Sequence, residues 1–496
     1  MVIMLIVINV LTLMNKKLFI TLFLLIPVFC MGMSKNKIVS VDRNGKVKGC
    51  TSVIAENDST FLIDSIRYKL IKNHLEVTDC IKKQKYSKIK FVYSLNFKGK
   101  KYNVTSIGNY VFLFDYILKE LEIHKGITCI KPYAFNNCSI QEKIKVDRDN
   151  QFYDSRNNCN ALIETKTNTL IIGCGNTLIP CDIQRIEQNA FLGNKVLRKI
   201  KIPKSVKSIG SLAFYKCYNL TKVELPEGLT SLEEGMFQEC LSLSDIHIPQ
   251  SVTTIGAWAF SGCNLESIEL PKGLKRIEGS AFISCKKLKN ITLPQSVTYI
   301  GKGAFSYCKN LKSVEVSPYS EIGNSGVKAE ISETSEPEDS LVNYRAFAYC
   351  DSLEKVTLPD GIKEIGSECF LMDNRLRRIF IPNSVEILGI TAFCPCESLE
   401  NIKLSENLQV VRFGAFGNCI KIKRIIIPNK VTTLEGKIFG GCINLEEVKL
   451  PASLTNIGEK IFYKTPNLKR IVIPKGNLDK FKSKLENEYH HLLVEE

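Results

Sequence analysis

Residues 220–240 read LTKVELPEGLTSLEEGMFQEC, and residues 243–263 read LSDIHIPQSVTTIGAWAFSGC. Both begin with L-x-x-[IV]-x-[IL]-P, where apolar and polar residues alternate as in a half-buried strand. Pro ends this segment because it cannot donate to a β-ladder. A second short extended segment, [SG]-[VL]-x-x-[IL], follows. The Phe-x-x-Cys segment is then expected to form a tight turn or a single helical turn that inserts an aromatic ring into the coil.

The same unit recurs along most of the chain, and its Phe marks the phase. Successive phased Phe are 23 residues apart, except that Phe260 to Phe282 is 22 and Phe305 to Phe347 is 42. A coil this short cannot bury its own apolar face, so neighbouring coils must stack. The sequence therefore predicts a mainly β repeat solenoid. The 14 phased positions are Phe112, Phe135, Phe191, Phe214, Phe237, Phe260, Phe282, Phe305, Phe347, Phe370, Phe393, Phe416, Phe439 and Phe462.

The departures from the repeat divide the chain. Residues 34–106 predict a small β region that caps the first coil, because a solenoid must hide its end face. Residues 107–473 form the repeats, interrupted by a hairpin insertion at about 147–181 and an acidic loop insertion at 317–340. Residues 474–496 are expected to form a helix that closes the last coil.

The first 33 residues are predicted to be a secretory signal peptide. Lys16 and Lys17 precede the apolar run 18–29, and small residues follow it. The run is too short to span a bilayer comfortably, so no integral span is expected in the mature chain. Met14 is an alternative start. Cys30 is a candidate for lipidation, but the bulky Phe29 before it disfavours this.

Ten of the 19 cysteines stand three residues after a phased Phe, which predicts one internal column. Buried free Cys behaves as a small hydrophobe with a weak donor, so the column is expected to pack the core and cap backbone carbonyls at the turn. A metal site would need clustered ligands, and none is predicted. A disulfide between Cys174 and Cys181 stays open. The column comprises Cys138, Cys217, Cys240, Cys263, Cys285, Cys308, Cys350, Cys396, Cys419 and Cys442.

The 23-residue unit I-P-x-S-V-x-x-I-G-x-x-A-F-x-x-C resembles the BspA-like (treponemal-type) leucine-rich repeats, and the resemblance covers about 60–496. It implies a curved right-handed leucine-rich-repeat coil in a bacterial surface protein that adheres to host matrix proteins or other cells. Asp373 and Thr465 depart from the pattern, because they replace the Cys of the column.

Residues eight and ten after each phased Phe are expected to point outward from the strand and to line one face. This face is mixed in the N-terminal half, whereas in the C-terminal half cations alternate with apolar residues. Exposed apolar groups bordered by charge are typical of protein contact sites. We therefore expect partner binding at Arg378, Phe380, Lys403, Arg424, Ile426, Lys449, Arg470 and Val472.

The formal net charge of +16 favours acidic partners. A secreted or cell-surface protein that binds an extracellular protein is the main hypothesis, and a module for anionic polysaccharide or glycan is the alternative. Nucleic acid is disfavoured by export. The five His lie outside known catalytic motifs, so no enzyme, catalytic residue or cofactor is predicted.

Overall fold

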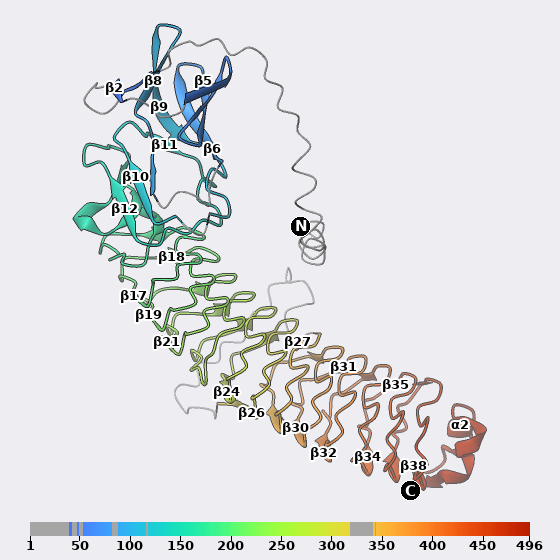
Figure 1. The fold of residues 1–496 in the computed structure, drawn as a ribbon. Coiled ribbons are helices and arrows are strands. Elements are labelled where there is room, and N and C mark those ends of the chain that lie inside the picture. Colours follow the sequence, from blue (N-terminus) through green and yellow to red (C-terminus); the bar gives the residue numbers. More distant parts are fainter. Residues whose placement is uncertain are drawn as a thin grey trace.

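A computed structural model describes residues 39–41, 47–48, 53–81, 88–115, 118–317, 341–342 and 344–496. The predicted signal peptide and nearly all of the loop insertion at 317–340 lie outside these residues. The chain forms an elongated, mainly β solenoid of about 16 turns of about 23 residues, which confirms the predicted fold class (Figure 1).

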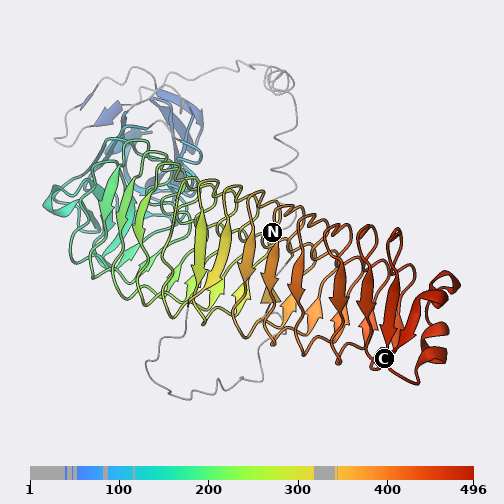
Figure 2. The ribbon, with the colours of Figure 1, turned by 90° about the horizontal axis from the view of Figure 1, so that it is seen from below.

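Most coils contribute one strand to each of two parallel columns, which run along opposite long sides of the body (Figures 1 and 2). The coil after Phe260 contributes only to the rear column. The front strands are β7 (Lys88–Lys90), β10 (Glu120–Ile123), β12 (Lys143–Val146), β17 (Lys199–Lys201), β19 (Lys222–Glu224), β21 (Asp245–His247), β24 (Asn290–Leu293), β26 (Ser313–Val316), β28 (Lys355–Thr357), β30 (Arg378–Phe380), β32 (Asn401–Lys403), β34 (Arg424–Ile426), β36 (Glu447–Lys449) and β38 (Arg470–Ile473). From β10 onward each front strand follows a turn that carries a phased Phe.

The rear strands are formed by the second extended segment of the repeat. From β20 to β37 they make one unbroken parallel sheet of ten strands. They are β16 (Arg185–Ile186), β18 (Ser208–Ile209), β20 (Ser231–Leu232), β22 (Thr254–Ile255), β23 (Arg276–Ile277), β25 (Tyr299–Ile300), β27 (Leu341–Val342), β29 (Glu364–Ile365), β31 (Ile387–Leu388), β33 (Val410–Val411), β35 (Thr433–Leu434) and β37 (Asn456–Ile457).

The Phe-containing segment forms hydrogen-bonded turns. Of the two predicted forms, the tight turn is therefore correct and the single helical turn is not. Around Phe214, the N–H groups of Leu212, Phe214 and Lys216 donate to carbonyls of the next coil. These donors are therefore unavailable for the bonds along the chain that define an α-helix. Leu212 and Lys216 both have φ of 58°, a left-handed conformation that also interrupts a helix.

The phased Phe rings form a continuous stack at the centre of the body. From Phe191 to Phe462 all are buried, and neighbouring ring centroids lie between 5.1 Å (Phe282 to Phe305) and 5.9 Å (Phe439 to Phe462) apart. Side chains of Leu, Ile and Val from both strand columns pack around the rings in one large hydrophobic cluster. The stack therefore joins all coils from the hairpin region onward into one core.

The cysteine column lies beside the rings and is buried, as predicted. The Cys285 thiol donates to the carbonyl of Phe260 at 3.1 Å, and the Cys308 thiol donates to that of Phe282 at 3.2 Å. Each thiol thus caps a carbonyl of the preceding coil. Burial raises the pKa of Cys263 to about 12, so the column holds neutral thiols. Every described cysteine is free, including Cys174 and Cys181.

The N-terminal cap is an antiparallel β region packed on a second hydrophobic cluster. Parallel pairing between coils starts at β6 with β9 and at β7 with β10, which is upstream of the expected boundary at residue 107. The cap strands are β1 (Val39–Val41), β2 (Val47–Lys48), β3 (Val53–Asn57), β4 (Thr60–Ile63), β5 (Ile66–Ile71), β6 (His74–Cys80), β8 (Ser94–Phe97) and β9 (Lys100–Ile107), with β11 (Cys129–Ile130) added beside β9.

The predicted hairpin lies within the stack and does not project from it. It consists of β13 (Tyr153–Asp154), β14 (Ala161–Glu164) and β15 (Thr169–Gly173), followed along the sheet by β16, which pairs in parallel with β15. Leu162 packs in the N-terminal cluster, whereas Ala161 and Ile163 pack in the solenoid cluster. The hairpin therefore connects the two cores.

The C-terminal cap differs from the single helix that we expected. It has one short helix, α2 (Leu478–Lys482), one 3-10 helix, η2 (Asn487–Leu492), and a final strand, β39 (Leu493–Glu495). Phe481 is buried against the last coil. The final strand pairs in parallel with β38, with Val472 opposite Val494, so the chain end closes the front column.

Asp373 occupies a position of the cysteine column and is fully buried. Its Oδ1 accepts the N–H of Cys350 at 2.8 Å, while Oδ2 has no hydrogen-bond partner among the described residues. Burial raises the pKa of Asp373 well above its usual value, so the carboxyl is favoured in its neutral form. Thr465 occupies another position of the column, and its hydroxyl donates to the carbonyl of Phe462 at 2.6 Å.

Replacing Cys285 with Ala should destabilise the protein by about 1–2 kcal/mol, because it removes one of the two donors to the Phe260 carbonyl, leaving only the N–H of Cys263, and opens a small void. Urea denaturation of the variant measures this, and Cys181→Ala, at an exposed cysteine, serves as the control. Equal midpoints for the two variants would contradict the capping role.

Asp373→Asn should stabilise the protein at neutral pH by about 1–3 kcal/mol, because the neutral amide avoids the cost of keeping a buried carboxyl protonated at that pH. The pKa of Asp373 is higher in the folded protein than in the unfolded chain, where it is about 4. The free energy of unfolding of the wild-type protein therefore falls as the pH rises from about 4 through the folded pKa. The advantage of the variant should therefore grow with pH. Denaturation midpoints measured from pH 4 to pH 8 test this, and a constant difference would refute it.

Candidate functional site

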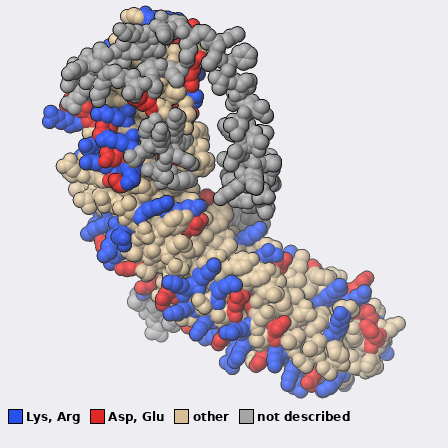
Figure 3. Space-filling model, in the orientation of Figure 1, with Lys and Arg blue, Asp and Glu red and all other residues tan. Residues whose placement is uncertain are grey.

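The outward side chains of the front strands form the front face. In its N-terminal half these side chains pair across coils: Lys88 lies 2.9 Å from both Glu120 and Glu122, and Lys222 lies 3.0 Å from Asp245. Stripes of opposite charge near β10 and β12 are visible in Figure 3. Such exposed pairs contribute little to stability. Lys143 and Lys145 on β12 and Lys199 on β17 are exposed and form no ion pair with a described residue, so the N-terminal half carries both paired and unpaired cations.

In the C-terminal half the front face carries cations that form no ion pair with any described residue. Arg378, Lys403, Arg424 and Lys449 lie on four successive strands, β30, β32, β34 and β36, and are exposed. We call these four side chains the cation row. Lys and Arg side chains recur along the corresponding edge of the body in Figure 3. An acidic partner could therefore pair with them without breaking an existing ion pair.

Two large apolar side chains lie among these cations. Phe380 is 57% exposed and Ile426 is 68% exposed, and they stand beside Arg378 and Arg424 on the same strands. Parallel register places Phe380 opposite Lys403. The sequence analysis predicted this arrangement, in which exposed Phe380 and Ile426 lie among cations.

Two predicted residues do not fit the site. Val472 lies opposite Lys449 in the ladder but is only 2% exposed, with β39 paired beside it, so it is not accessible to a partner as we expected. Arg470 is exposed but lies 2.6 Å from Glu496 and 3.5 Å from Glu447, so its charge is already balanced. The terminal segment Leu493-Val494-Glu495 is the sequence signal for this covering strand, and it was missed because it lacks the repeat Phe.

A groove of about 670 Å³ lies within the C-terminal front face, between the coils of β32 and β34. Lys403, Arg424, Ile426 and Lys430 line it together with Glu406. Nothing in the repeat pattern indicated a groove here, since the other coils of this half stack with regular register.

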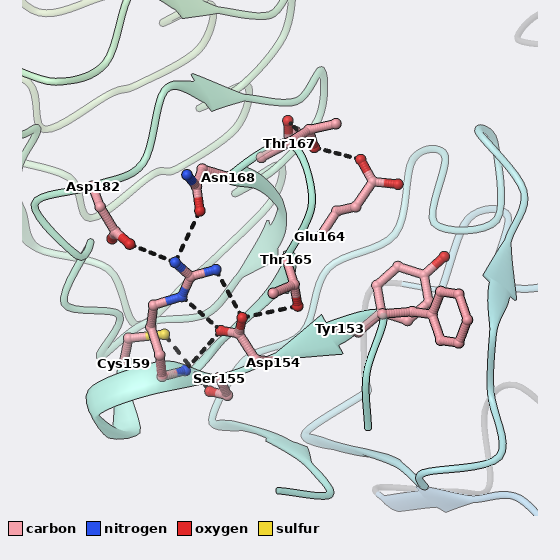
Figure 4. A network of polar contacts seen from close by, with 12 residues as sticks. Tyr153, Asp154, Ser155, Cys159, Glu164, Thr165, Thr167, Asn168 and Asp182 are labelled. Atoms are coloured by element: carbon pink, nitrogen blue, oxygen red, sulfur yellow. Dashed lines mark hydrogen bonds and ion pairs between the residues drawn. The ribbon is translucent and has the colours of Figure 1, made fainter. Parts of the chain in front are cut away.

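A second polar network surrounds Arg156 near the hairpin (Figure 4). Its guanidinium contacts both oxygens of Asp154, the side-chain oxygen of Asn168 at 2.9 Å, and Asp182. Burial opposes ionisation of Asp154, but hydrogen bonds from Arg156 and Thr165 outweigh it and lower the pKa of Asp154. Each charge has a partner, so the network fastens the hairpin to the following coil.

Two described histidines of the repeat region lie in different environments. Burial lowers the pKa of His124 to about 4, and its Nδ1 accepts the N–H of Gly126 at 3.1 Å, which is a packing arrangement. His247 is exposed and lies 4.0 Å from Glu227. Among these residues no group of three or more His, Cys, Asp or Glu could hold a metal ion. Nor does any of their helices have the length and apolar character to cross a lipid bilayer.

Solved structures resemble the chain over most of its length. A leucine-rich repeat protein from Bacteroides ovatus is 24% identical with a TM-score of 0.56, covering 88% of this chain and 99% of its own. A leucine rich cell surface protein from Faecalibacterium prausnitzii is 24% identical with a TM-score of 0.41, covering 86% of this chain and 98% of its own. No curated protein matches the chain.

The family match spans nearly all of the repeats. Residues 79–174, 172–286, 232–327, 330–439 and 365–488 match the BspA type leucine rich repeat region. These segments cover far more than half of the chain, and they coincide with the stacked coils. The chain therefore belongs to the BspA-type leucine-rich repeat family.

Proposed function

We propose that the protein is an exported recognition protein that binds an acidic extracellular protein through the C-terminal half of its front face. The observation that carries the proposal is the cation row, Arg378, Lys403, Arg424 and Lys449, which has no ion pairs among the described residues and stands beside exposed Phe380 and Ile426. Charge complementarity favours encounter with an acidic partner, and the apolar groups add buried area once the partner is bound.

Export and surface location rest on the predicted signal peptide and on the family. The signal peptide at 1–33 supports export. The relative from Faecalibacterium prausnitzii is a cell surface protein by name, which supports the same location here. Adhesion to a host matrix protein or to another cell is the role that fits such a location. No catalytic step, cofactor or metal enters this proposal.

Anionic glycan is the second candidate, and the same unpaired cations favour it. A glycan would depend mainly on the charges, whereas a protein would also depend on Phe380 and Ile426. Binding of the full chain to a panel of extracellular matrix proteins and to an array of anionic glycans separates the two.

The triple variant Arg378→Ser, Arg424→Ser, Lys449→Ser should weaken binding by at least about tenfold and reduce its sensitivity to salt, because it removes unpaired cations from the contact. Arg470 is left unchanged because its charge is already balanced. Surface plasmon resonance at two salt concentrations against the proteins identified by the panel measures the effect.

A matched control removes the same number of charges from elsewhere on the front face. Lys201, Lys222 and Lys355 pair with Glu224, Asp245 and Glu315, so their replacement by Ser should change binding little. If both triple variants lose affinity equally, the effect reflects net charge alone and the proposed surface is wrong.

A further inference from the structure

The front column of strands is interrupted once within the cation row. Strands β24 to β32 form one sheet and β34 to β39 form another, and no pairing joins β32 to β34. Behind this break the rear column stays intact, with Val410 opposite Thr433, and the rings of Phe393 and Phe416 remain stacked at 5.4 Å. The coils therefore separate only at the front, and we call this opening the seam.

The seam leaves backbone donors without acceptors. In neighbouring coils the N–H groups of Arg377 and Glu446 donate to the preceding coil, at 3.0 Å to Glu354 and at 2.8 Å to Lys423. The equivalent N–H of Lys423, like that of Arg424, has no acceptor among the described residues. These donors lie at the edge of β34, as on the free edge of a sheet, where an extended chain can pair with them.

The side chains around the seam favour a negatively charged ligand. Three cations, Lys403, Arg424 and Lys430, line the groove with one carboxylate, Glu406. Another groove, of about 570 Å³, lies where β21 ends the preceding front sheet, but there Glu266 is already paired with Lys289 at 2.8 Å. Unpaired cations, unpaired donors and an exposed apolar side chain thus occur together at the seam.

We propose that the seam between β32 and β34 binds an extended acidic peptide segment of the protein partner. Carboxylates of the segment pair with Lys403 and Arg424, its backbone accepts from the N–H groups of Lys423 and Arg424, and an apolar side chain of the segment covers Ile426. This inference rests on the proposed function, because it names the part of the partner that the front face recognises. Backbone donors and an apolar contact favour a peptide over a glycan, which would engage the cations alone.

The test uses the full chain and an end-blocked octapeptide that alternates Glu and Val, with its affinity measured by fluorescence anisotropy. The seam variant Lys403→Ser, Arg424→Ser should weaken binding by at least about tenfold. The off-seam variant Arg378→Ser, Lys449→Ser removes two cations of the same row that do not line the groove, and it should weaken binding less than about threefold. Circular dichroism and thermal unfolding confirm that both variants are folded.

The nature of the ligand is tested with three further probes. An octapeptide that alternates Glu and Gly should bind more weakly than the Glu-Val peptide, and Ile426→Ser should abolish this difference. An octapeptide that alternates Lys and Val should not bind. A heparin octasaccharide that binds more tightly than the Glu-Val peptide and loses as much affinity in the seam variant would overturn the peptide assignment.

The outcomes separate this inference from the proposed function. Equal losses for the seam and off-seam variants would leave the front face as the binding surface and refute the seam. Full retention of binding in both variants, for the peptide and for the matrix proteins, would refute the proposed function as well. Failure of the Glu-Val peptide to bind the wild-type chain would refute the seam alone.

Discussion

Stacking of one coil on the next is the constraint on which the rest of this structure depends. No coil of about 23 residues can bury the ring of its own Phe, so each ring is covered by the rings before and after it, at about 5 Å. Between the same coils the cysteine thiols cap the carbonyls of the Phe residues. Core packing and hydrogen bonding therefore act along the same axis, and both require the repeat to keep its phase.

This constraint divides the residues into two classes. Inward positions and the backbone donors of the turn are committed to the neighbouring coil, so they change little from repeat to repeat. Outward positions of the front strands contribute little to the stack and are free to differ. In the N-terminal half several of them pair across coils, as Lys222 does with Asp245. In the C-terminal half Arg378, Lys403, Arg424 and Lys449 form no ion pair with a described residue and stand beside exposed Phe380 and Ile426, which leaves charge and apolar surface available for a partner.

The repeat phase allowed the solenoid, the Phe stack, the cysteine column and the shared face of the front strands to be predicted from sequence. Each of these follows from a local pattern repeated many times. Features that occur once were not predictable in this way. The strand that buries Val472 lies outside the repeat, and the hairpin joins two cores by alternating the direction of its side chains at Ala161, Leu162 and Ile163. The seam has no clear sequence signal: Ser405 replaces the Pro that Pro382 and Pro428 supply in the adjacent coils, but Ser317 does the same after β26, which pairs on both sides.

Hydrogen–deuterium exchange of the full chain, with and without the Glu-Val octapeptide, tests most directly the claim that stacking leaves one open recognition surface. The account predicts that the amides of Lys423 and Arg424 exchange much faster than those of Arg377 and Glu446 in the free protein. On binding, the gain in protection should centre on residues 401–403 and 423–426. Equal protection of these amides in the free protein, or a gain centred on the rear strands, would contradict it.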